Sequence, residues 1–123
     1  MTTVVSGRVV LSVLWVALML VYLLGDVLRI FTGDFVPGEI QGRQAAPWMW
    51  TLAAGLMLIP IAMAVVSVML ADPTLKWVTV GAAAFLILFN LAGLPYPGLY
   101  DNLLIGVGIT INVVTIWQVW TMT

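Results

Sequence analysis

The sequence contains no cysteine and no histidine, and only 7% of its 123 residues are charged. Without cysteine the chain has no disulfides, no thiol nucleophile and no thiolate metal ligand. Without histidine it lacks the commonest metal ligand and the usual proton shuttle near neutral pH. Four basic residues and a formal charge of −1 provide no basic surface for nucleic acid. We therefore expect no nucleic-acid partner, no cofactor or metal, and no catalytic residues.

Hydrophobic residues, by contrast, make up 63% of the chain, and the mean hydropathy is +1.19. Ordinary soluble domains have about 45–50% apolar and about 25% charged residues. A water-soluble fold of this length has too little interior to hide so much apolar surface. The composition therefore predicts a membrane protein in contact with the lipid bilayer.

Four segments are long and apolar enough to cross about 30 Å of hydrocarbon, which takes about 20 helical residues. The first resembles a secretory signal, but its apolar run is too long and no small-residue cleavage site follows, so we expect a retained span. The sequence predicts an all-α, four-helix membrane bundle that forms a single domain over residues 1–123. The predicted spans are approximately Val9–Phe31, Trp48–Ala71, Lys76–Leu94 and Leu99–Trp120.

Polar and small residues recur at three- and four-residue spacing on three of these spans, which places each set on one helix face. Because unpaired polar groups are costly in hydrocarbon, these faces are expected to line the bundle interior. The sets are Ser12, Trp15, Met19, Tyr22, Asp26 and Arg29; Lys76, Thr79, Ala83, Leu86 and Asn90; and Asp101, Ile105, Gly108, Asn112 and Thr115.

Two further local features carry predictions. Pro60, near the centre of the second span, removes a backbone donor and clashes with the carbonyl of Leu56, which predicts a kink. In the connection between the first two spans, Glu39 and Arg43 are four residues apart, which predicts a short helical turn. Phe35, Val36 and Ile40 in this connection are apolar enough to dock on the bundle end nearest Asp26.

Asp26 and Arg29 are the ionisable residues that lie within the first span. At 1.5 Å per residue Asp26 lies about 9 Å from the bilayer centre, and Asn90 of the third span lies about 7 Å from it on the same side. Ala53, Ala54 and Gly55 of the second span and Ile105 and Gly106 of the fourth are expected at this level. The candidate intramembrane polar site comprises Tyr22, Asp26, Arg29, Asn90 and Asn112.

Asp26 has two interpretations. In the structural one it forms an i,i+3 ion pair with Arg29, accepts a hydrogen bond from Tyr22 and holds the first span against Asn90. In the functional one it is a protonatable or cation-binding group, the default hypothesis for an ionisable residue inside a membrane. The structural interpretation is favoured, because an arginine partner holds the carboxylate ionised and makes it a poor proton carrier.

Three stretches carry a family resemblance: LWVALMLVYLLGDVL, GLMLIPIAMAVVSVML and LKWVTV. On the basis of these stretches, nearly the whole chain resembles a family of small bacterial four-helix membrane proteins that is classified only as a domain of unknown function. The resemblance implies the same fold and gives Asp26 added interest, but it implies no activity. Leu58 stands where members of this family often have a glutamate, and this difference weakens any mechanism with two intramembrane carboxylates.

The sequence favours a small multi-pass protein of the bacterial inner membrane that serves as a structural or accessory component without catalytic activity. The alternative is a minimal transporter or channel that works as a homodimer around Asp26. Partners are therefore expected to be lipid and either a second copy or a larger membrane complex. Arg8 and Lys76 lie on one side of the membrane, and Arg29 and Arg43 on the other, so the balance of positive charge is even. If Arg29 is held by Asp26, the balance favours cytoplasmic termini.

Overall fold

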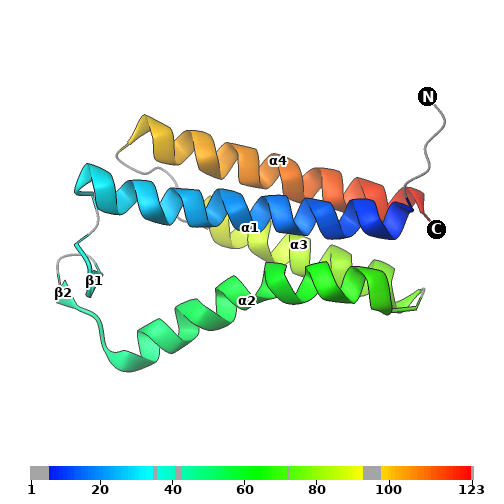
Figure 1. Cartoon of the computed structure of the whole chain (residues 1–123), viewed down its shortest axis with the longest axis horizontal. Coiled ribbons are helices and arrows are strands. Elements are labelled where there is room, and N and C mark those ends of the chain that lie inside the picture. Colours follow the sequence, from blue (N-terminus) through cyan, green and yellow to red (C-terminus); the bar gives the residue numbers. More distant parts are fainter. Residues whose placement is uncertain (1–5, 35, 41–42, 72, 93–97, 123) are drawn as a thin grey trace.

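The computed structural model describes residues 6–34, 36–40, 43–71, 73–92 and 98–122, which form four long helices and one β-hairpin (Figure 1). All four helices are long and apolar enough to span a membrane. The predicted all-α bundle of four spans is confirmed. Predicted helix ends differ from the observed ones by at most two residues, and the predicted end at Leu94 lies outside the described residues. The helices are α1 (Gly7–Thr32), α2 (Pro47–Met69), α3 (Thr74–Ala92) and α4 (Leu99–Thr121).

Helix α1 has a side-chain cap at its start and a glycine at its end. The Ser6 hydroxyl accepts a hydrogen bond from the backbone N–H of Arg8 at 3.2 Å, which satisfies one of the free donors of the first turn. The helix stops at Gly33, whose φ of 80° lies in the left-handed region that residues with a side chain rarely adopt. These two ends give α1 a defined length, and Arg29 is in its last turn.

The connection after α1 contains a β-hairpin rather than the predicted helical turn. Strand β1 (Glu39–Ile40) pairs antiparallel with β2 (Arg43–Gln44), and Glu39 lies opposite Gln44. Pro37 and Gly38 precede it in a turn closed by a 3.0 Å hydrogen bond from Glu39 N to Val36 O. Gly38 has φ 87°, as the third position of a type II turn requires. This turn leads into extended backbone, so the prediction of a helix at Glu39–Arg43 was wrong.

The predicted docking of this connection on the bundle is only partly described. Val36 is 53% exposed, so it does not dock as expected. Phe35 and the side chain of Ile40 lie outside the described residues. In Figure 1 the hairpin lies between the end of α1 and the start of α2.

Helix α1 packs against both α2 and α4, and α3 packs mainly against α4. Of the four pairs of helices that pack together, α2 and α3 have the smallest contact. Figure 1 shows α2 bent partway along, with the half nearer Pro47 leaning away from the other helices. The bend agrees with the predicted kink at Pro60, which is buried inside the helix. The bundle is therefore closed around α1 and α4 and looser between the first half of α2 and α3.

The core forms two layers along the bundle. The larger one surrounds Trp15 and Leu18 with Met63, Ala83 and Leu86, and it occupies the middle. The smaller one packs Leu11, Leu75 and Val119 near the start of α1. Of the predicted interior faces, the α4 set is buried throughout, and the α1 and α3 sets are buried or half-buried except for Asp26.

Cations at the end where α1 starts and α4 ends contact helix carbonyls and aromatic rings. Arg8 donates to the backbone carbonyls of Ser67, at 3.4 Å, and of Leu70, at the end of α2. A cation there interacts favourably with the negative end of the helix dipole. The ammonium of Lys76 lies 3.8 Å from the centroid of the Trp120 ring, a cation–π contact.

Candidate functional site

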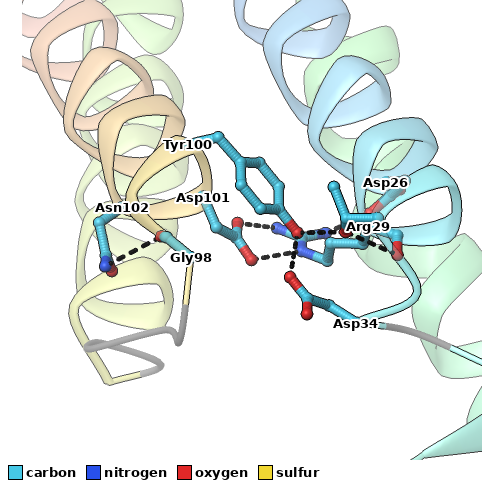
Figure 2. A network of polar contacts seen from close by, with 8 residues as sticks. Asp26, Arg29, Asp34, Gly98, Tyr100, Asp101 and Asn102 are labelled. Carbon is cyan, nitrogen blue, oxygen red and sulfur yellow. Dashed lines mark hydrogen bonds and ion pairs between the residues drawn. The ribbon is translucent and has the colours of Figure 1, made fainter.

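Arg29 connects α1 to α4 through a network of ion pairs (Figure 2). Its Nη1 donates to Oδ1 of Asp26, one turn earlier in α1, at 2.6 Å. Its Nε and Nη2 donate to the two carboxylate oxygens of Asp101, in the first turn of α4, at 2.9 and 2.8 Å. Because a guanidinium presents its donors in a rigid planar fork, this two-point contact fixes both distance and orientation. The predicted Asp26–Arg29 ion pair is therefore present, but the more extensive pairing is with Asp101.

Burial differs sharply among these three groups. The side chain of Asp101 is 4% exposed, that of Arg29 is 24% exposed and that of Asp26 is 52% exposed. A buried carboxylate needs a partner to offset the loss of hydration, and the guanidinium supplies both hydrogen bonds that Asp101 accepts. Helical spacing predicts the interior position of Asp101, but not its pairing with Arg29.

A second polar network lies next to this triad. The Tyr100 hydroxyl donates to Oδ2 of Asp34 at 2.6 Å and lies 2.9 Å from Oγ1 of Thr32. Figure 2 shows Tyr100 reaching from α4 over the end of α1, beside Arg29. Both networks therefore join the same two helix ends, and Asp34 and Tyr100 were not among the predicted site residues.

Tyr22 and Asn90 form a separate contact, deeper in the bundle. Asn90 Nδ2 donates to the Tyr22 hydroxyl at 2.8 Å and to the Leu86 carbonyl at 2.9 Å. The expected hydrogen bond from Tyr22 to Asp26 and the contact between Asp26 and Asn90 are replaced by this link. The reason is geometric, because the tyrosine side chain spans the gap to α3 while the Asp26 carboxylate turns toward Arg29.

Asn112 of α4 is fully buried beside Tyr22. Neither polar atom of its side chain forms a hydrogen bond of regular geometry with a described residue, although the side chain interacts with the Tyr22 hydroxyl. Trp15 Nε1 and Thr79 Oγ1 are also buried, and neither has a hydrogen-bond partner among the described residues. Buried polar groups are normally paired, so the centre of the bundle retains unused hydrogen-bonding capacity. Of the five predicted site residues, the structure joins Asp26 to Arg29 and Tyr22 to Asn90, with Asn112 next to Tyr22.

A cavity of about 150 Å³ lies where the first half of α2 leans away from α3. Tyr22, Asp26, Arg29 and Asn90 form its polar lining. Its α2 wall comes from Leu56 and Met57, whereas Ala53, one of the small residues expected at this level, lines a second hollow. This second hollow, of about 280 Å³, is also lined by Asp26 and Arg29, together with Ile30, Trp50 and Ala53. The two charged side chains of α1 thus contribute to both hollows, and α2 residues line each of them.

The side chains of this site are suited to binding a ligand. It offers a half-exposed carboxylate, an amide and a phenol beside apolar walls. Within the described parts of the chain, His, Cys, Asp and Glu form no group of three that could hold a metal ion.

No family model matches the chain, and neither a curated protein nor a solved structure matches it. The resemblance to bacterial four-helix proteins of unknown function therefore stays a prediction. The four long apolar helices indicate a four-pass membrane protein.

Proposed function

We propose that this four-pass membrane protein is a structural or accessory component of a cell membrane, of the bacterial inner-membrane type, without catalytic activity of its own. The observation that carries the proposal is the double contact of Arg29 with Asp101. In this contact Arg29 and the buried Asp101 hold α1 and α4 together, which is a structural role within the bundle.

A surface on α4 supports association with a partner helix. Asn102, Leu103, Gly106, Val107, Thr110 and Ile111 line a shallow groove on this helix. A Cβ added at Gly106 meets nothing within 4 Å, so the groove floor is open. Gly106 and Thr110 have the four-residue spacing of small residues that lets membrane helices approach closely. A helix from a larger complex or from a second copy fits this surface.

Purification from native membranes in a mild detergent, followed by mass spectrometry, tests the proposal. We expect a partner in fixed stoichiometry. Gly106→Leu should reduce its recovery because a side chain would fill the groove, whereas Gly55→Leu on the open surface of α2 should not. Recovery of the chain without any partner, in both wild type and variants, would contradict the accessory role.

The second candidate is a minimal transporter or channel that works as a homodimer around Asp26. The observation in its favour is that Asp26 is 52% exposed and lines both hollows. Reconstitution of the chain alone into liposomes tests it. Solute or proton flux that is lost in Asp26→Asn but retained in Asp34→Asn would favour transport over the accessory role.

A further inference from the structure

The cavity between α1, α2 and α3 combines hydrogen-bond acceptors with apolar walls. Asp26 Oδ1 accepts from Arg29, whereas Oδ2 has no hydrogen-bond partner among the described residues. Asn90 uses its Nδ2 on Tyr22 and Leu86, and its Oδ1 likewise has no partner in the described part of the chain. Both residues line the cavity, and each has one side-chain acceptor left for a ligand.

A backbone feature adds to this acceptor character. Leu56 lines the cavity, and its carbonyl would normally accept a helical hydrogen bond from residue 60. Residue 60 is proline, which has no N–H to donate. Pro60 therefore both kinks α2 and leaves the carbonyl of Leu56 without its usual helical hydrogen-bond donor.

Asp26 and Arg29 both line the cavity, whereas Asp101, the second acid bound to Arg29, lies outside its lining. Two carboxylates, Asp26 and Asp101, face one guanidinium, that of Arg29, so the triad carries one excess negative charge. The excess charge is accessible at Asp26, because Asp101 is buried and both its oxygens accept from Arg29. An anion or a phosphate would meet repulsion here, whereas a cation with N–H donors complements both the charge and the acceptors.

The rest of the lining is apolar and borders the lipid. Met57 of α2 and Leu86 and Phe89 of α3 line the cavity, and Phe89 is 52% exposed on the outer surface. An aromatic ring also attracts a cation placed over its face. An alkyl chain attached to the cationic group can therefore leave the cavity between α2 and α3, the packed helix pair with the smallest contact, and continue into the bilayer.

We infer that this cavity binds a long-chain primary amine from the bilayer, with the ammonium between Asp26 Oδ2 and Asn90 Oδ1 and the alkyl chain between α2 and α3. Depth favours such an amine over an aminophospholipid. Asp26 lies about 9 Å from the bilayer centre, whereas the hydrocarbon half-thickness is about 15 Å. A phospholipid would have to bring its phosphate below the interface and next to an excess negative charge. The inference holds for an accessory component and for a transporter alike.

The test uses the full chain in phosphatidylcholine nanodiscs and a dodecylamine derivative with a photoreactive diazirine in its chain. We expect saturable labelling of the peptides that contain Met57 and Phe89. Unlabelled dodecylamine should compete, whereas dodecanol and dodecanoate at the same concentration should not. Labelling that does not saturate, or equal competition by dodecanol, would overturn the inference.

Two charge variants separate a specific site from general attraction of cations. Asp26→Asn should weaken labelling about ten-fold, the effect of losing a charge-assisted contact. Asp34→Asn removes the same charge at the same end of the bundle, outside the cavity lining, and should leave labelling unchanged. Equal losses in both variants would show surface attraction only and refute the site. Circular dichroism and gel filtration confirm that each variant is folded.

A cavity-filling variant keeps the inference testable if Asp26→Asn does not fold. Met57→Trp occupies the cavity but leaves every charge in place, and it should reduce labelling several-fold. Adding phosphatidylethanolamine to the nanodiscs should not compete. Competition by this lipid would assign the site to a lipid headgroup and overturn the choice of a simple amine. Unchanged labelling in Met57→Trp would show that the amine does not bind in this cavity and would overturn the inference.

Discussion

Arg29 on α1 and Asp101 on α4, 72 positions apart in sequence, form a two-point ion pair with donor–acceptor distances of 2.9 and 2.8 Å. Asp26 takes a third donor of the same guanidinium. The contact with Asp101 is largely buried and ties two helices, whereas the contact with Asp26 is half-exposed and lies within one helix. The two acids therefore differ in what they contribute to stability.

Arg29→Gln should lower the free energy of unfolding by about 3 kcal/mol, because it leaves the buried carboxylate of Asp101 without its cation. Titration with SDS in dodecyl maltoside micelles, followed by circular dichroism, measures the change. The matched control is Arg43→Gln in the exposed strand β2, which should stay within about 0.5 kcal/mol of wild type. A similar stability for both variants would show that the Arg29 network contributes little.

Asp26→Asn should lower stability by no more than about 1 kcal/mol, the range of exposed ion pairs. If Asp26 were the sole partner of Arg29, its removal would leave the guanidinium unpaired and cost more. The structure changes that expectation, since Asp101 still holds the guanidinium by two hydrogen bonds. Asp101→Asn should cost more than Asp26→Asn in the same SDS titration.

A double-mutant cycle checks this ranking. The coupling energy between Arg29→Gln and Asp101→Asn should exceed that between Arg29→Gln and Asp26→Asn, because coupling reports direct contact between the groups. If the coupling with Asp26 is the larger, the helix-to-helix pairing does not dominate, and Asp26 is the principal partner of Arg29.

Gly108 and Gly106 of α4 form a matched pair of sites. A Cβ added at Gly108 would lie 3.4 Å from Cε1 of Tyr22, whereas one added at Gly106 would meet nothing within 4 Å. Gly108→Ile should therefore displace Tyr22 from Asn90 and cost about 1–3 kcal/mol through overpacking. Gly106→Ile carries the same change in helix propensity and serves as the control in the unfolding titration. Equal effects would mean that the bundle interior at Tyr22 accommodates extra volume.

The four spans and their interior faces could be predicted because hydrophobic length and helical spacing are local properties of the sequence. Asp26–Arg29 could be predicted for the same reason, as an i,i+3 pair on one helix. The contact of Arg29 with Asp101 could not, because it depends on the relative rotation and height of two helices within a turn. The β-hairpin was missed because the spacing of Glu39 and Arg43 was given more weight than the Pro37–Gly38 turn signal before it.

The cavity was only half predicted. Tyr22, Asp26 and Asn90 were placed at one level by counting residues, and all three line it. Residues 53–55 of α2 were expected at the same level. Ala53 does line the second hollow with Asp26 and Arg29, but Leu56 and Met57 line this cavity. The kink at Pro60 tilts the preceding half of α2, so a residue count along straight helices does not give the α2 residues that line the cavity.

The last prediction concerns orientation: the start of α1 and the end of α4, which lie at the same end of the bundle, should face the cytoplasm. Arg29 is neutralised by its two acids, so Arg8 and Lys76 at this end outweigh Arg43 at the other under the positive-inside rule. Because the chain has no cysteine, single-cysteine variants report each side without background. With a membrane-impermeant maleimide added to intact cells, Gln44→Cys should be labelled and Thr121→Cys should be protected until the cells are opened. Replacing both Arg8 and Lys76 by Gln should shift the pattern toward mixed labelling, whereas Arg43→Gln should sharpen it. External labelling of Thr121→Cys in the otherwise unchanged chain would reverse the assignment.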